Sequence, residues 1–159
     1  MARVVRRRRI AAPTSALWSV IADPYHLPRW WPRTQRVENV SAGEEAGRSW
    51  TQVLETKDGR GVRADYRCVE SDPEERYVFE QSIEDTPFER FVKRARTEVS
   101  LAPRNGETDV TMALDRRLRG LSRLGAPMMR RAIARTLDEA LTGLESAATG
   151  SESPPRTRS

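Results

Sequence analysis

The sequence has few of the residues on which most enzyme and metal sites depend. It contains one cysteine, Cys68, and one histidine, His26. A single cysteine excludes an internal disulfide, and the two residues are too few for a zinc site built from several histidine and cysteine ligands. A nucleophile activated by histidine would have to use His26. The phosphate-binding loops GxGxxG and GxxxxGKS/T are also absent, so the sequence predicts neither a metal nor a bound cofactor.

Long apolar runs are missing as well. No stretch approaches the ~20 residues that cross a bilayer as a helix, and the first ten residues, MARVVRRRRI, lack the apolar centre of a secretory signal. The expected compartment is therefore the cytoplasm. A length of 159 residues suits one domain. We place this domain at residues 1–149, and we expect the Ser/Pro-rich residues 150–159 to be a disordered tail.

Positive charge is concentrated in two parts of the chain. The net charge is +5; residues 1–10 contain five arginines and no acid, and residues 116–135 contain seven arginines and no acid. Residues 38–89 are acidic instead, with 14 acids against six bases. Such a polarised protein can steer an anionic partner, but its acidic middle disfavours a wide nucleic-acid surface. We therefore expect no nucleic-acid partner.

The hydrophobic pattern predicts a mixed order of strands and helices. Residues 3–10 form the first strand, and Pro13 and Asp23-Pro24 bound a short helix over 14–22. Three prolines then allow at most one helical turn at a time in residues 24–32. Alternation with a period of two predicts six further strands, at 35–41, 47–57, 61–71, 75–84, 88–101 and 108–117. A long helix with one apolar stripe follows, from Pro127 to about Ala148.

These elements predict an α+β fold in which a sheet grips a helix. The strand at 61–71 has Ala64 and Tyr66 on one face and Arg63 and Asp65 on the other, so one face of the sheet is buried. The apolar stripe of the long helix must cover that face. A seven-stranded antiparallel sheet twists and curls, so it wraps around the long C-terminal helix, with two short helices after the first strand. The end far from the helix then encloses a cavity.

Several segments resemble the START-like, polyketide cyclase/dehydrase superfamily, which includes the Bet v 1-type proteins. The similar segments are Ile10-Ala11-Ala12-Pro13, Leu17-Trp18, Asp23-Pro24, Leu27-Pro28-Arg29-Trp30-Trp31-Pro32, Gly47-Arg48-Ser49-Trp50, Glu70-Ser71-Asp72-Pro73, Asn105-Gly106-Glu107-Thr108-Asp109-Val110 and Leu141-Thr142-Gly143-Leu144-Glu145. The resemblance covers residues 3–148 and implies the helix-grip fold with an apolar pocket between the sheet and the last helix. It also implies that the first strand neighbours the last, which would place Arg6–Arg9 beside Arg116, Arg117 and Arg119. The family includes carriers as well as cyclases, so the resemblance implies no particular reaction.

The candidate site is marked by polar residues that lie on the apolar face of the predicted strands. Gln52, Tyr66, Gln81 and Thr97 each take an inward position, and a buried amide or hydroxyl needs a partner that a bound ligand or water can supply. Structural hydrogen bonding inside the core is the alternative explanation. The full predicted ligand site is Trp30, Trp50, Gln52, Tyr66, Phe79, Gln81, Thr97, Met129 and Ile133.

Three other conspicuous features have simpler interpretations. Trp30 and Trp31 can form the mouth of the pocket or plug the core beneath the helical turn. His26 is expected to be a solvated or capping residue, and Cys68 a small buried hydrophobe, because nothing near it in the sequence lowers its pKa.

Three classes of function fit the sequence. The principal hypothesis is a soluble binding protein for a hydrophobic or aromatic small molecule, as a monomer or homodimer. The alternative is an enzyme of polyketide cyclase/dehydratase type that uses the same pocket. Tyr66, an inward arginine such as Arg7 or Arg9, or a pocket carboxylate could then move protons, and the catalytic residues stay unassigned. The third class, an arginine surface for nucleic acid or membrane, lacks the interleaved aromatic residues of single-strand binding.

Overall fold

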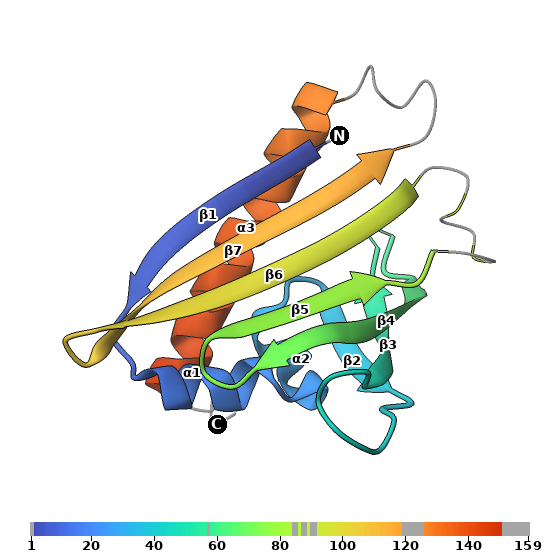
Figure 1. The fold of residues 1–159 in the computed structure, drawn as a ribbon. Coiled ribbons are helices and arrows are strands. Elements are labelled where there is room, and N and C mark those ends of the chain that lie inside the picture. The colour runs from blue at the N-terminus through green and yellow to red at the C-terminus, as the bar shows by residue number, and fades with distance from the viewer. Residues whose placement is uncertain are drawn as a thin grey trace, which may run out of the picture.

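The computed structural model describes residues 2–56, 58–83, 86, 89, 92–118 and 126–150. Figure 1 shows its elements in chain order. They are β1 (Ala2–Ile10), α1 (Thr14–Ile21), a 3-10 turn η1 (Pro24–His26), α2 (Leu27–Trp30), β2 (Thr34–Glu38), β3 (Ser49–Glu55), β4 (Gly61–Asp72), β5 (Arg76–Gln81), β6 (Val92–Arg104), β7 (Glu107–Leu118) and α3 (Ala126–Thr149). The predicted order of elements is confirmed. Residues 151–159, which make up nearly all of the predicted tail, lie outside the described residues.

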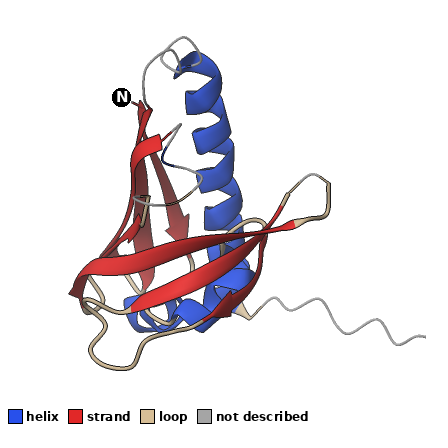
Figure 2. Ribbon diagram, turned by 90° about the vertical axis from the view of Figure 1, so that its right-hand side faces the viewer, coloured by secondary structure: helices blue, strands red, loops and turns tan. Residues whose placement is uncertain are grey.

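The strands form one seven-stranded sheet in the order β1-β7-β6-β5-β4-β3-β2, and every neighbouring pair is antiparallel. The first strand therefore closes onto the last, and the other strands follow one another as hairpins. Figure 2 shows the sheet curving around α3, which runs along its inner face. This arrangement confirms the predicted α+β helix-grip fold.

The turn between β6 and β7 fixes the register of the longest hairpin. Asn105 and Gly106 both have positive φ angles, 51° and 82°, which is the backbone of a two-residue hairpin turn of the type that favours Asn-Gly. Arg104 then pairs with Glu107, and the pairing continues along both strands as far as Val92 and Leu118, with one irregularity between Val92 and Arg94. The Asn-Gly signal in the sequence therefore sets which residues of β7 face inward.

The core lies between the inner face of the sheet and α3. The apolar stripe of α3 is buried as predicted; its buried members are Ile133, Leu137, Ala140, Leu141 and Leu144. The inward positions of β7 are buried with it at Val110, Met112 and Leu114. The alternation of the strands and the 3.6-residue period of the helix thus meet in one core.

Close backbone contact holds α2 against α3. Leu27 and Trp30 of α2 are buried, and Gly143 of α3 faces the Trp30 backbone. A Cβ atom at Gly143 would lie only 2.6 Å from the Trp30 carbonyl oxygen. The helices approach this closely because glycine has no side chain at that position. This contact places Trp31, the residue after α2, at the inner face of the sheet.

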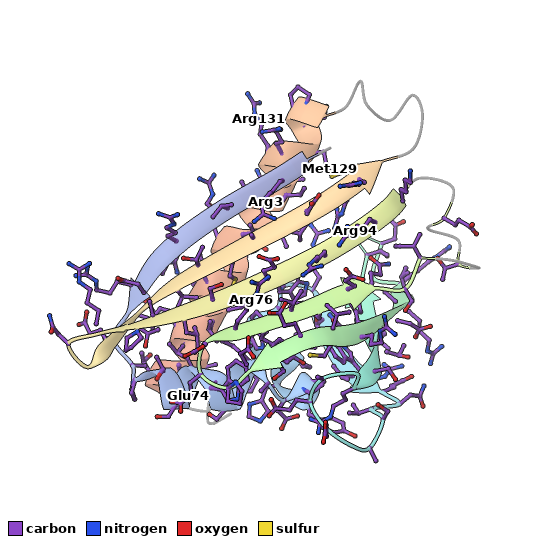
Figure 3. The ribbon with its side chains drawn as sticks, viewed as in Figure 1. Arg3, Glu74, Arg76, Arg94, Met129 and Arg131 are labelled. Atoms are coloured by element: carbon purple, nitrogen blue, oxygen red, sulfur yellow. The ribbon has the colours of Figure 1, made fainter. Side chains whose placement is uncertain are left out.

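Ion pairs cover the outer face of the sheet. Figure 3 views this face with α3 behind it and labels Arg76 and Arg94. Arg76 pairs with Glu98 at 3.0 Å, and Arg94 pairs with Glu80 at 3.2 Å. Single exposed pairs contribute little, about 0–1 kcal/mol each, but together they cover the apolar Val78, which is fully buried.

The prediction that Arg6–Arg9 lie beside Arg116 and Arg117 is wrong. β1 and β7 are antiparallel, so Arg116 pairs with Ala2, whereas Arg6–Arg9 pair with residues 109–112 at the other end of β7. Arg9 forms an ion pair with Asp109 at 3.1 Å. Adjacent strands were predicted correctly, but the register separates the two groups of arginines. Arg119 lies outside the described residues.

Candidate functional site

A cavity of about 640 Å³ lies between the inner face of the sheet and the middle of α3. Its volume is within the roughly 300–1,000 Å³ that is typical of small-molecule sites. Apolar side chains from the α2 region, the strands and α3 form much of its described lining: Trp31, Leu54, Val62, Ala95, Leu114 and Ala132. The cavity therefore suits a molecule with an apolar or aromatic body. Charged side chains complete part of the lining: Arg33, Glu55, Arg116, Arg135 and Glu139.

Three polar side chains enter this apolar lining from neighbouring strands. Tyr66 of β4 lies opposite Gln81 of β5, and Thr97 of β6 lies one strand further along the sheet. None of the three side chains has a hydrogen-bond partner among the described residues. Adjacent strands thus bring together one phenol, one amide and one hydroxyl that are free to bind a molecule in the cavity.

Tyr66 packs against other aromatic rings. Its ring stacks on Trp50 with centroids 6.2 Å apart and planes 10° apart, and it meets Phe79 edge to face at 5.9 Å. Burial raises the pKa of Tyr66 to about 12, and the nearby positive charge of Arg116 opposes part of this rise. The phenol is therefore neutral at physiological pH and can donate its proton in a hydrogen bond.

Arg116 places a positive charge at the same part of the cavity. It follows Val110, Met112 and Leu114 on the inward parity of β7, and it lines the cavity. One guanidinium nitrogen lies 3.6 Å from the Met129 sulfur of α3. Burial lowers the pKa of Arg116, although arginine stays protonated in proteins. Sequence analysis missed this residue, although the spacing of two from Val110, Met112 and Leu114 puts it on the same face of the predicted strand 108–117.

Three of the nine residues predicted for the ligand site, Tyr66, Gln81 and Thr97, line the cavity. The other six lie outside its lining. Trp30, Trp50, Phe79, Gln52 and Ile133 are buried in the core, and Met129 packs against the core from α3. Parity predicts the face of the sheet on which a residue lies, but not whether another side chain covers it.

Gln52 and Trp30 lie outside the cavity lining for two different reasons. The Gln52 amide accepts a hydrogen bond from Trp50 Nε1 at 3.1 Å and donates one to Thr34 Oγ1 at 3.2 Å, so it is satisfied inside the protein. Trp30 is buried against α3, and its neighbour Trp31 lines the cavity instead. Trp31 also meets Phe79 edge to face at 5.7 Å and so separates it from the cavity.

The single histidine and cysteine lie outside the described lining of the cavity. His26 Nε2 lies 3.5 Å from a carboxylate oxygen of Asp23, the residue that precedes η1. Cys68 is buried, and its sulfur donates a hydrogen bond to the Glu70 carbonyl oxygen at 3.4 Å. Burial raises the pKa of the Cys68 thiol, which disfavours the reactive thiolate. Across the described residues, no group of three or more His, Cys, Asp and Glu side chains could hold a metal ion.

Comparisons with known proteins agree with this geometry. A family model described as "Polyketide cyclase / dehydrase and lipid transport" matches residues 1–149. The chain belongs to this family. No curated protein sequence matches the chain significantly.

Solved structures related to this family member share its fold over nearly the whole chain. A protein from Thermus thermophilus has a TM-score of 0.75 at 22% identity, with 95% of this chain and 99% of that chain covered. A START superfamily protein from Mycobacterium smegmatis has a TM-score of 0.77 at 14% identity and coverages of 94% and 99%. The Zhui aromatase/cyclase from Streptomyces sp. R1128 has a TM-score of 0.68 at 17% identity and coverages of 93% and 91%. At these identities the likeness extends to the fold alone.

Among the described residues of this family member, no helix is long and apolar enough to cross a membrane.

Proposed function

We propose that this protein binds a hydrophobic or aromatic small molecule in the cavity between the sheet and α3. The observation that carries the proposal is the set of three uncharged polar side chains, Tyr66, Gln81 and Thr97, that have no partner among the described residues and enter a cavity with apolar side chains on every wall. A polar group taken from water costs free energy unless it finds a hydrogen bond. A ligand with an apolar body and one or two polar groups would satisfy them.

The family description supports a ligand-binding role of this kind. It names lipid transport beside cyclase and dehydrase activity, and both need an apolar molecule to enter the protein. Binding requires only the cavity and its lining, and the described lining supplies both. The proposal therefore uses fewer assumptions than any reaction.

The alternative is an enzyme of cyclase/dehydratase type in the same cavity. Tyr66 and Arg116 favour it, because a neutral phenol and a guanidinium can stabilise negative charge that develops on a carbonyl oxygen. Glu55 and Glu139 also line the cavity and could accept protons. The solved Zhui aromatase/cyclase has a similar fold, which supports the same alternative.

Binding of a neutral fluorophore, N-phenyl-1-naphthylamine, tests the main proposal. We expect saturable binding by the native protein and loss of binding in Thr97→Trp, because the larger ring fills the cavity. Ser100→Trp is the matched control, since Ser100 lies three residues along β6 on the outer face. Equal binding by both variants would contradict the proposal, because the fluorophore would then lie on the surface.

Product analysis separates the enzyme from the carrier. The protein would be incubated with a linear poly-β-ketone, and products would be compared by chromatography for the native protein and Tyr66→Phe. The enzyme is favoured if the native protein forms cyclised product, Tyr66→Phe does not, and both proteins bind the fluorophore equally. No difference from the uncatalysed reaction would favour the carrier.

A further inference from the structure

The charge of Arg116 is not neutralised by any carboxylate of the described structure. Arg76, Arg94 and Arg96 on the outer face pair with glutamates at 3.0–3.5 Å. Arg116 points the other way, into the cavity, and its hydrogen bond within the described residues goes to the Met129 sulfur. A thioether is a weak acceptor, so the guanidinium keeps most of its donors unused. Arg116 is half-buried at the wall of the cavity. A ligand that removes this charge from water binds favourably only if it pairs with it, which an anion does.

The part of the cavity around Arg116 is also electropositive for a second reason. Met129, which Arg116 contacts, lies in the first turn of α3, and this turn contains no acidic residue. The positive end of the helix dipole is therefore uncompensated there and favours an anion nearby. Figure 3 shows Met129 and Arg131 at this end of α3; Arg131 is exposed and lies outside the lining of the cavity, so the charge that enters the cavity here is that of Arg116.

The two carboxylates of the lining lie away from Arg116 and from its neighbours Met129 and Tyr66. Glu139 is ten residues beyond Met129 on α3, about 15 Å along the helix axis. Glu55 pairs with Gly61, which precedes Tyr66 by five residues on β4, about 17 Å along that strand. The positive end of the cavity is therefore at Arg116, whereas the parts near the carboxylates carry charges of both signs, because Arg33 and Arg135 line them as well.

Neighbouring residues leave room for an anion at this positive end. Arg116 lies opposite Ala95 on β6, whose small side chain also lines the cavity. Tyr66 is close enough for the charge of Arg116 to act on its hydroxyl, and the phenol is neutral, with a pKa of about 12. A carboxylate could accept hydrogen bonds from both the guanidinium and the phenol, and charge-assisted bonds of this kind are the strong ones.

We propose that the ligand is a hydrophobic organic acid, whose apolar body fills the cavity and whose carboxylate pairs with Arg116 and Tyr66. This inference rests on the proposed function, because it requires the cavity to hold a ligand. It goes further by specifying the charge of the ligand and its direction in the cavity.

Two fluorophores with the same ring system test the charge separately from the cavity. N-phenyl-1-naphthylamine is neutral, and 1-anilinonaphthalene-8-sulfonate carries one negative charge. The native protein should bind the sulfonate at least tenfold more tightly. Arg116→Met should weaken sulfonate binding about tenfold and leave the neutral dye unchanged. Arg117→Met is the matched control, since Arg117 is the next residue of β7 and is exposed; it should change neither dye.

Displacement experiments extend the test to carboxylates. 2-Naphthoate should displace the sulfonate from the native protein at a concentration at least tenfold lower than 2-naphthamide, and this preference should disappear in Arg116→Met. Thermal unfolding of each variant checks that the fold is intact. Equal sulfonate binding by native protein and Arg116→Met would overturn the inference about the charge of the ligand. If the native protein still binds the neutral dye in that case, the proposed function stands. Failure of the native protein to bind either dye would overturn both.

Discussion

Substitution of Gly143 by alanine tests how α2 is held against α3 and, through it, the mouth of the cavity. The added Cβ would lie 2.6 Å from the Trp30 carbonyl oxygen and 2.8 Å from the Trp30 Cα. These atoms belong to the backbone, so no side-chain rotation can relieve the contact. Ordinary packing begins at 3.4 Å, so the two helices must separate by about 0.8 Å at this point.

Two opposing effects set the size of the change in stability. Overpacking of this kind costs about 1–3 kcal/mol, whereas replacing glycine by alanine inside a helix gains about 1 kcal/mol. The steric cost is larger here because the obstruction is backbone on both sides. We therefore expect Gly143→Ala to lower the free energy of unfolding by about 1–2 kcal/mol.

Equilibrium denaturation in urea measures this difference directly, at an unchanged slope of free energy against denaturant. Ser146→Ala is the matched control, because Ser146 is exposed in the same helix and its change should stay within about 0.5 kcal/mol. Because Trp31 lines the cavity next to α2, Gly143→Ala should also weaken binding of the neutral fluorophore. A variant as stable as the native protein, or more stable, would refute the close approach of the two helices.

Two further predictions concern Tyr66 and the tail. The pKa of Tyr66 is raised to about 12 in the folded protein, so on raising the pH the unfolded chain loses the phenol proton first. The contribution of the neutral phenol to the free energy of unfolding is complete below the unfolded pKa of about 10. It is lost as the pH rises towards 12. Denaturation measured between these pH values should show a smaller alkaline loss of stability in Tyr66→Phe, and an identical loss would contradict the buried phenol. Deletion of residues 150–159, which we predict to be a disordered tail, should shift the melting temperature by at most ~2 °C, and a larger loss would mean that these residues pack on the domain.

Most of the fold could be predicted because its signals are local. The period-two runs identified the strands, and the 3.6-residue stripe from Ile133 to Leu144 identified α3. The ends of elements were less certain: the strand predicted at 88–101 is observed as β6 at Val92–Arg104. Hairpin pairing supplies hydrogen bonds up to the Asn105–Gly106 turn, and this pairing extends β6 beyond its apolar residues.

The site was predicted less completely because burial in a curled sheet depends on distant segments. Phe79 and Thr97 are register partners and both point inward, yet only Thr97 lines the cavity. Phe79 is surrounded by the rings of Trp31, Trp50 and Tyr66, and Trp31 follows α2, which packs against Gly143. No pattern within β5 or β6 contains that information.

The charge of the cavity also depends on distant structure, because the register of β7 decides which of its charged residues faces inward. The sequence shows Asp115, Arg116 and Arg117 in a row, and their composition does not reveal which of them enters the cavity. The Asn105–Gly106 turn and the buried residues Val110, Met112 and Leu114 fix the parity of β7, so Arg116 faces inward and Asp115 lies between Arg3 and Arg96 on the two adjoining strands. A slip by one residue would exchange the faces of the strand and would replace Arg116 in the cavity by Asp115 or by Arg117, depending on its direction. The two-residue turn at one end of the sheet therefore determines which charged residue a ligand meets at the other end.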